Sequence, residues 1–363
     1  MKKIILFFLF AWTGLSLFAQ TDRSELDKQI GYAIMLMDNG AVDESIEALN
    51  ELRKTVPDDF IIQYELAYAY YLKQDYAAAI KVLKKLRKNK DAEDILYQLL
   101  GNSYDVAGNP KLALGAYKQG LKRFPNSGRL YFEQGVVYGT KYNDFNTALA
   151  CFEKGIEMDP AYPSNYFWAS KLFCESSDEE IWGMIYGELF LNLEPGTQRT
   201  EEISRLLYDT YQSEITFPND TTVSVSFSRN NVIDFAALID AGRRILSVLP
   251  YGMAVYEATL SLASIGEKEI GLASLNRIRT AFLENYYKNF GERFPNALFA
   301  YQKEVAAAGH LEAYNYWVVS AGDPQGFLVW HDENPEKWEA FVQWFETNPI
   351  RLDGNNRFYR GQY

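Results

Sequence analysis

Few residues in this chain have the chemistry of a metal site or a catalytic site. The 363 residues include only two His and two Cys. A zinc site needs three or four nitrogen or sulfur ligands, and neither His310 nor His331 has partners at a suitable spacing. The acidic runs at residues 178–180 and 332–333 are typical of solvated loops, because glycosidase chemistry needs carboxylates that converge across a cleft. We therefore predict no metal and no cofactor.

Sequence signatures of common enzyme classes are absent as well. The chain has no Gly-x-Ser-x-Gly nucleophile elbow, no phosphate-binding loop and no Gly-x-Gly-x-x-Gly turn after a strand. We predict that the protein is not an enzyme. The enzymatic alternative would need a pocket that converges on His310 or His331, and replacing either residue would then abolish the activity.

The charge balance excludes two classes of partner. The chain carries 36 Lys and Arg against 48 Asp and Glu, a formal net charge of −12. A nucleic-acid-binding protein needs a basic surface that displaces counterions from phosphates. Docking on an anionic membrane surface needs basic residues too. The composition therefore favours a protein partner over a nucleic acid.

The first 19 residues have the features of a signal peptide. Lys2 and Lys3 precede an apolar run from residue 4 to residue 18, and Ala19 completes a plausible cleavage site before Gln20. The run is short for a bilayer span, and no Cys follows it that could carry a lipid. Its Phe-Ala-Gln ending resembles signal peptides of Bacteroidota. We expect an exported protein, periplasmic or extracellular, and a retained membrane anchor is the alternative.

A period of about 34 residues organises the first half of the chain. Pro57, Pro125, Pro160 and Pro195 are separated by 68, 35 and 35 residues, and 68 is twice 34. Small and large residues recur at the same places within each period, as in the pairs Gly101 and Tyr104, Ala113 and Tyr117, Gly135 and Tyr138, and Ala148 and Phe152. A small residue lets two helices approach, and the large residue fills the space between neighbouring pairs.

This pattern resembles the tetratricopeptide repeat, a helix–turn–helix unit that ends near a proline. The resemblance covers residues 20–195 as about five repeats, of which the fifth is degenerate in its second helix. It implies a mostly α protein with a tetratricopeptide-like α-α superhelix, or solenoid. Such proteins bind partners in a concave groove that is lined by the first helix of each repeat.

The second half is less regular. We expect degenerate helical repeats over residues 196–285, interrupted by a small β-hairpin near residues 215–228, and a further helix over residues 235–249. Residues 286–363 are rich in aromatic side chains. Since the last repeat of a solenoid would otherwise expose an apolar face, we expect this region to form a helical C-terminal cap.

The resemblance implies which side chains face the groove. Ile30 and Ile34 hold these positions in the first repeat. The groove positions of the next four repeats are occupied by Tyr64, Tyr68, Tyr71, Gln98, Asn102, Asp105, Arg129, Phe132, Tyr166 and Phe173. Tyr buries a large area at low entropic cost, so an extended peptide or a helix with apolar anchors fits such a groove. The alternative is that these rings pack on the adjacent repeat or on the C-terminal region.

Cys151 and Cys174 lie on the second helix of the fourth repeat and the first helix of the fifth. Such helices pack together, and an exported location permits oxidation, so a disulfide is one alternative. Two buried thiols that act as small apolar side chains are the other, which we favour.

These observations predict an exported, non-catalytic scaffold or adaptor that holds a partner peptide or helix in the groove. A glycan-binding module is a second possibility, in which Trp317 and Trp330 would present their rings to solvent in one plane. The hairpin tip at residues 219–221 either makes a second contact with the partner or has no role in binding. Residues 220–222 also resemble an O-glycosylation acceptor of Bacteroidota.

Overall fold

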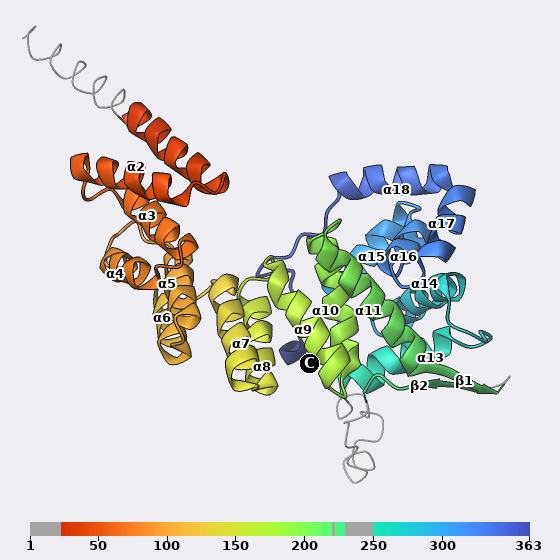
Figure 1. Cartoon of the computed structure of the whole chain (residues 1–363). Coiled ribbons are helices and arrows are strands. Elements are labelled where there is room, and N and C mark those ends of the chain that lie inside the picture. Colours follow the sequence, from red (N-terminus) through yellow and green to blue (C-terminus); the bar gives the residue numbers. More distant parts are fainter. Residues whose placement is uncertain (1–22, 220–221, 229–249) are drawn as a thin grey trace, which may run out of the picture. The chain divides into compact units, whose positions relative to one another are not determined.

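The computed structural model describes residues 23–219, 222–228 and 250–363, and these residues form a mostly α-helical fold (Figure 1). The chain divides into two compact units, unit 1 (Met1–Pro125) and unit 2 (Asn126–Tyr363). The predicted signal peptide, the hairpin residues 220 and 221 and the predicted helix over residues 235–249 lie outside the described residues. No helix within the described ranges combines the length and the apolar character that crossing a membrane requires.

Unit 1 contains three helix–turn–helix repeats. A helix over residues 23–38 pairs with α2 (Val42–Thr55), α3 (Phe60–Leu72) pairs with α4 (Tyr76–Leu86), and α5 (Asp94–Val106) pairs with α6 (Pro110–Arg123). Asp59 and Asp75 cap α3 and α4 by accepting hydrogen bonds from backbone N–H groups of the first turn. Gly40 and Gly108 have φ of +80° in the turns of the first and third repeats, a conformation that favours glycine.

Unit 2 begins with two further repeats. They are formed by α7 (Gly128–Tyr142) with α8 (Phe145–Met158), and by α9 (Pro163–Ser176) with α10 (Glu180–Leu193). The extra residue in the turn of the fourth repeat is accommodated by Asn143, which adopts a left-handed φ of 52°. The small–large pattern acts as expected, because a Cβ on Gly135 would overlap the ring of the buried Phe152.

The expected hairpin is confirmed. Helix α11 (Gln198–Glu214) leads directly into β1 (Ile215–Asn219), which pairs antiparallel with β2 (Thr222–Val225). The chain then returns to α10, since the Ile181 N–H donates to the Phe227 carbonyl at 3.3 Å. Residues 229–249 follow, so the expectation that the hairpin interrupts a degenerate helical repeat stays a prediction.

From residue 250 to residue 347, unit 2 is mainly helical. A π-helix, η2 (Gly252–Glu257), continues into α13 (Ala258–Ala263), and Gly266 makes the expected turn with a φ of +92°. Five helices follow, namely α14 (Leu272–Asn289), α15 (Ala297–Ala307), α16 (Leu311–Val318), α17 (Pro324–Glu333) and α18 (Pro335–Thr347). Helix α14 crosses residue 285, where we expected the cap to begin. The last element is η3 (Arg360–Gln362).

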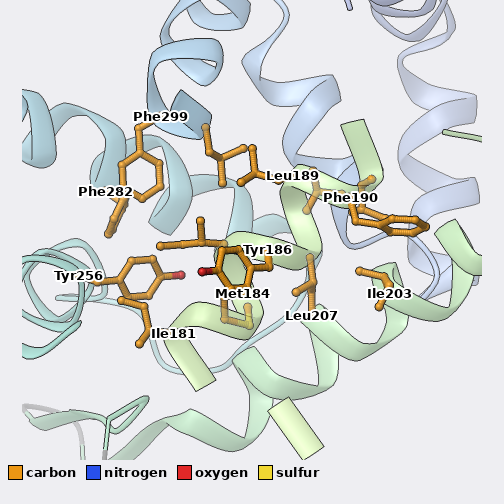
Figure 2. Packing of buried hydrophobic residues seen from close by; sticks show 14 of the residues in the cluster. Ile181, Met184, Tyr186, Leu189, Phe190, Ile203, Leu207, Tyr256, Phe282 and Phe299 are labelled. Carbon is orange, nitrogen blue, oxygen red and sulfur yellow. The ribbon is translucent and has the colours of Figure 1, made fainter. Parts of the chain in front are cut away.

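Helix α10 lies at the centre of the unit 2 core. All residues from Glu180 to Asn192 are buried, whichever side of the helix they occupy. Figure 2 shows its side chains between Ile203 and Leu207 of α11 and the rings of Tyr256, Phe282 and Phe299. A helix enclosed on all sides has no polar face. This burial explains why the second helix of the fifth repeat looks degenerate in the sequence.

One buried ion pair crosses this core. The Arg279 guanidinium donates two hydrogen bonds to the Glu188 carboxylate, at 2.8 and 2.7 Å. Gln302 and Tyr314 donate to the Oε1 atom of Glu188 at 2.6 and 2.8 Å. A cavity of about 20 Å³ beside Glu188 and Arg279 has room for about one water molecule. The small cavity and the paired charges give this cluster a structural role.

Candidate peptide-binding face of unit 1

A row of exposed apolar side chains follows one face of α3. Ile61, Tyr68 and Leu72 are 42%, 38% and 39% exposed, and they are spaced seven and four residues apart. Tyr64 and Tyr71 are half-buried on the same helix. The opposite face packs into the core, where Leu66 is fully buried. Residues separated by three, four and seven positions share one side of a helix, so these side chains form a continuous stripe.

Helix α5 extends this surface. It contacts α3, and its Ile95 and Val106 are exposed while Gln98, Asn102 and Asp105 are half-buried. The buried Tyr117 of α6 donates its hydroxyl hydrogen to the Asn102 side chain. This hydrogen bond fixes the orientation of one polar group between the exposed apolar residues. We call the surface formed by Ile61, Tyr64, Tyr68, Tyr71, Leu72, Ile95, Gln98, Asn102, Asp105 and Val106 the α3–α5 face.

Sequence reasoning missed four members of this face, Ile61, Leu72, Ile95 and Val106. A signal was available, because Ile61 precedes Tyr64 by three residues and Val106 follows Asn102 by four. These spacings put each missed residue on the same side of its helix as a predicted groove position. Two of the four, Leu72 and Val106, are the last residues of their helices, where the spacing is easy to overlook.

The α3–α5 face is acidic as well as apolar. Neither α3 nor α5 contains a Lys or Arg, whereas they carry Glu65, Asp94 and Asp105. Burial raises the pKa of Glu65, and the charge of Asp38 raises it further. A positive charge near Glu65 would therefore lower the free energy of its ionised form.

The groove positions predicted in unit 2 are less accessible. Tyr166 and Phe173 have no exposed surface, so the expectation that they line an open groove is wrong. The Tyr166 hydroxyl donates to the Pro160 carbonyl at 3.0 Å, and both rings lie against Tyr186 of α10. The physical reason is that α10 and α11 both cover α9.

The remaining predicted groove positions divide between half-buried and buried. Arg129 and Phe132 of α7 are half-buried, and the Phe132 ring lies 6.0 Å from Phe152 and 6.1 Å from Tyr162. In the first repeat, Ile30 is buried and does not line a groove. Ile34 is half-buried and packs against the unit 1 core. These side chains are therefore partly or fully buried against neighbouring residues, as the packing alternative predicts.

The aromatic residues proposed for glycan stacking pack on other rings. Trp330 is buried, its ring is stacked on Tyr316 at 4.4 Å, and its Nε1 donates to Glu312 at 3.1 Å. Trp317 is half-buried, with Phe345 at 5.0 Å. The expectation that Trp330 presents its ring to solvent is therefore wrong, and the structure shows no plane formed by these two residues.

The two histidines have different neighbours. His310 precedes α16 and lies beside the ring of Trp344, with 5.6 Å between ring centroids. His331 lies 3.4 Å from Asp332, its neighbour in the chain. Among the residues that the structure describes, no three His, Cys, Asp or Glu side chains are grouped as metal ligands would be.

Both cysteines are free thiols in the structure, and each residue is half-buried rather than fully buried as we favoured. Burial raises the pKa of Cys151 to about 11 and that of Cys174 to about 12. Because the thiolate is the reactive species, we expect both to react with a thiol reagent at about pH 8 at least about 100-fold more slowly than an ordinary cysteine.

Time courses of labelling with a chromogenic disulfide reagent test this prediction. Both thiols should react rapidly once the protein is unfolded in urea. Labelling of the native protein at the rate of the unfolded chain would contradict the burial of the two side chains.

Comparisons with known proteins agree with the helical repeats. Tetratricopeptide repeat models match residues 33–94 and 128–162. Solved structures of MamA are similar over part of the chain. One is 19% identical, covering 44% of this chain and 93% of its own, with a TM-score of 0.37. MamA from Desulfovibrio magneticus RS-1 is 17% identical over 46% of this chain and 92% of its own, with a TM-score of 0.35.

A third MamA structure, titled AMB-1, is 25% identical over 37% of this chain and 78% of its own, with a TM-score of 0.31. The comparison with curated proteins found no match. The α3 residues of the α3–α5 face lie within the first matched segment, and its α5 residues lie just beyond that segment. The chain thus contains tetratricopeptide repeats in unit 1 and at the start of unit 2.

Proposed function

We propose that this protein is a non-catalytic interaction scaffold whose α3–α5 face binds a peptide or helix of a partner protein. The observation that carries the proposal is the stripe of exposed Ile61, Tyr68 and Leu72, continued by Ile95 and Val106 on the neighbouring helix. Exposed apolar side chains that cluster on one surface are typical of protein interaction sites. The tetratricopeptide repeats support the same class of function.

The charge of the face favours a basic partner segment. Helices α3 and α5 contain no Lys or Arg, and Glu65 of α3 would be stabilised in its ionised form by a basic side chain of the partner. Opposite charges across an interface raise the association rate and help to set the register of binding. We infer a partner segment that alternates apolar anchors with Lys or Arg.

We propose further that the scaffold acts outside the cytoplasm, in the periplasm or at the cell exterior. The support is the sequence of residues 1–19, in which two lysines precede a short apolar run and a small residue at the expected cleavage position. Amino-terminal sequencing of the protein from its native envelope should begin at Gln20. A sequence that begins at the initiator methionine would contradict export by cleavage.

Affinity capture with matched variants tests the binding face. We expect the double variant Ile61→Ser, Tyr68→Ser to bind its partner at least about tenfold more weakly than the native protein, because truncating two central contacts removes buried apolar area. Leu112→Ser is the control, since Leu112 is an equally exposed apolar residue on α6, outside the face. A partner captured from envelope extract is identified with the native protein, and its affinity for each variant is then measured.

Circular dichroism must show that both variants keep the native helical content. A partner that binds the double variant as tightly as the native protein would show that the α3–α5 face has no part in binding. Equal loss in the double variant and in Leu112→Ser would point to a general effect of exposed apolar residues and would contradict the proposal as well.

A further inference from the structure

The last fifteen residues of the chain run past α15 and reach the fourth and fifth repeats through Arg357 and Arg360. After α18, residues 349–359 form neither helix nor strand, yet Ile350, Leu352 and Phe358 are buried. Figure 1 shows the dark blue end of the chain beside α9 and α10. We call residues 357–363 the tail.

Arg360 of the tail inserts into a pocket formed by two carboxylates and a tyrosine. Its Nε and Nη2 atoms donate to the two oxygens of Glu153, at 3.0 and 2.7 Å, and its Nη1 donates to Glu179 at 2.6 Å. Glu153 belongs to α8, and Glu179 precedes α10. The Arg360 backbone N–H donates to the Tyr186 hydroxyl at 2.9 Å. This arrangement matches the planar fork of a guanidinium, which an ammonium group does not reproduce.

The pocket has a strong requirement for a cation. The Tyr186 hydroxyl donates to Glu153 at 3.1 Å, and the guanidinium carbon of Arg360 lies 5.1 Å above the Phe173 ring. Burial raises the pKa of Glu153, the charge of Glu179 raises it further, and Arg360 opposes both effects. Without a guanidinium, two carboxylates would face one another with little solvent around Glu153. The pocket is therefore complete only when an arginine occupies it.

An aromatic site accompanies the arginine pocket. Phe358 is fully buried, with ring centroids 6.0 Å from Trp182 and 5.8 Å from Tyr251. Tyr363 stacks on Tyr251 at 5.1 Å, and its hydroxyl donates to the Pro295 carbonyl at 2.7 Å. The tail thus presents an aromatic anchor two residues before an arginine, and each of these two residues has its own site.

The tail reaches this site from the surface. The Arg360 and Glu179 side chains are 37% and 32% exposed, and Gly361 and Gln362 are exposed as well. A ligand that competes with the tail can therefore approach the carboxylates from solvent. Phe358, by contrast, must leave before another aromatic ring can take its place.

We propose that the fourth and fifth repeats form a second peptide-binding site, for segments with an aromatic residue two positions before an arginine, and that the tail occupies this site as the chain's own ligand. The partner is a segment of another protein with the same chemistry, which binds when the tail is displaced. This site lies in unit 2 and does not depend on the α3–α5 face. Because the tail occupies this site, a partner segment must compete with the tail in order to bind.

Binding of a labelled peptide to the full chain tests this proposal. The probe is a fluorescent peptide with the sequence of residues 355–363, Asn-Asn-Arg-Phe-Tyr-Arg-Gly-Gln-Tyr. In the native protein the tail competes at an effective concentration on the order of 1 mM, so the apparent affinity should be low. In Arg360→Ala the competitor is weakened, and we expect the peptide to bind at least about tenfold more tightly by anisotropy. A peptide with Ala in place of its second Arg is the matched control.

Two further variants keep the test valid in case Arg360→Ala fails to fold. Arg357→Ala loosens the tail outside the pocket, where Arg357 donates only to the Glu157 carbonyl at 2.6 Å. We expect it to raise peptide affinity to a lesser extent than Arg360→Ala. Glu153→Gln combined with Arg360→Ala should lose the gain, because the bidentate acceptor is gone.

Two results would overturn the proposal. The first is that the peptide shows no saturable binding to either Arg360→Ala or Arg357→Ala while circular dichroism shows both to be folded. The second is that the Ala-substituted peptide binds Arg360→Ala as tightly as the arginine peptide does. In both cases the tail would serve only to close the surface of unit 2.

Discussion

Replacing Arg279 with Ala is expected to lower the free energy of unfolding of unit 2 by about 3–5 kcal/mol. The substitution leaves the Glu188 carboxylate buried and without its bidentate partner, and it also removes the bond from Arg279 to Asn315 at 2.9 Å. A lone buried charge retains only Gln302 and Tyr314 as donors. The loss reflects the cost of burying the unpaired carboxylate more than the strength of the original pair.

Urea unfolding followed by tryptophan fluorescence measures this effect. The described residues of unit 1 contain no tryptophan, whereas unit 2 contains six, at positions 168, 182, 317, 330, 338 and 344. Arg277→Ala is the matched control, because Arg277 lies two residues away and its side chain is 60% exposed where it pairs with Glu267 at 2.7 Å. We expect that control to cost about 0–1 kcal/mol.

A double variant that removes both charges tests whether the loss of stability comes from the unpaired carboxylate or from altered packing. Glu188→Gln with Arg279→Met removes both charges and keeps similar volumes, so it should be less destabilised than Arg279→Ala alone. A loss below about 1 kcal/mol in Arg279→Ala would mean that Glu188 takes up a proton or gains water at little cost, and the assigned structural role would then be wrong.

Two glycine-to-alanine substitutions in unit 1 should have effects of opposite sign. A Cβ on Gly101 would overlap the ring of Tyr117, which is buried and holds Asn102 through its hydroxyl. We expect Gly101→Ala to destabilise unit 1 by about 1–3 kcal/mol, because the ring has no free space into which it can move. Gly115, in exposed helical backbone of α6, has no atom within 4 Å of the new Cβ. Its substitution should stabilise by about 0.5–1 kcal/mol.

Far-UV circular dichroism during urea unfolding tests this pair of variants. The Gly101→Ala transition should shift to lower urea concentration and the Gly115→Ala transition to higher. Equal shifts in the same direction would show that helix propensity alone governs both positions. In that event the close approach of α5 and α6 would not limit the residue at position 101.

The repeat architecture could be predicted because its cause is local. Each repeat pairs a small residue with a large one at a fixed spacing, as Gly101 and Tyr117 do across α5 and α6, and this packing recurs with the period. The hairpin was predictable for the same reason, since alternating strand residues flank a polar turn. The helical pairs over residues 23–193 and strands β1 and β2 follow from these neighbouring interactions.

The site could be predicted only in part. The position of a residue within a repeat indicates which side of the helix it occupies, but not which element covers that side. Tyr68 remains exposed, whereas Tyr166 at the comparable groove of the fifth repeat is buried beneath α10. Which element covers that side depends on contacts between residues far apart in the sequence. Likewise, Glu153 and Arg360 are separated by 207 residues and carry no local signal of their pairing.

The order of synthesis adds a consequence for α10. Its Glu188 bonds to Arg279, Gln302 and Tyr314, which follow it by 91, 114 and 126 residues. At roughly 5–20 residues per second, a ribosome adds the last of these partners about 6–25 s after Glu188. Each helix pair of unit 1 is complete within about one repeat of chain. During translation, α10 therefore remains an exposed apolar segment for longer than the helix pairs of unit 1, and Glu188 stays hydrated until its partners have been made.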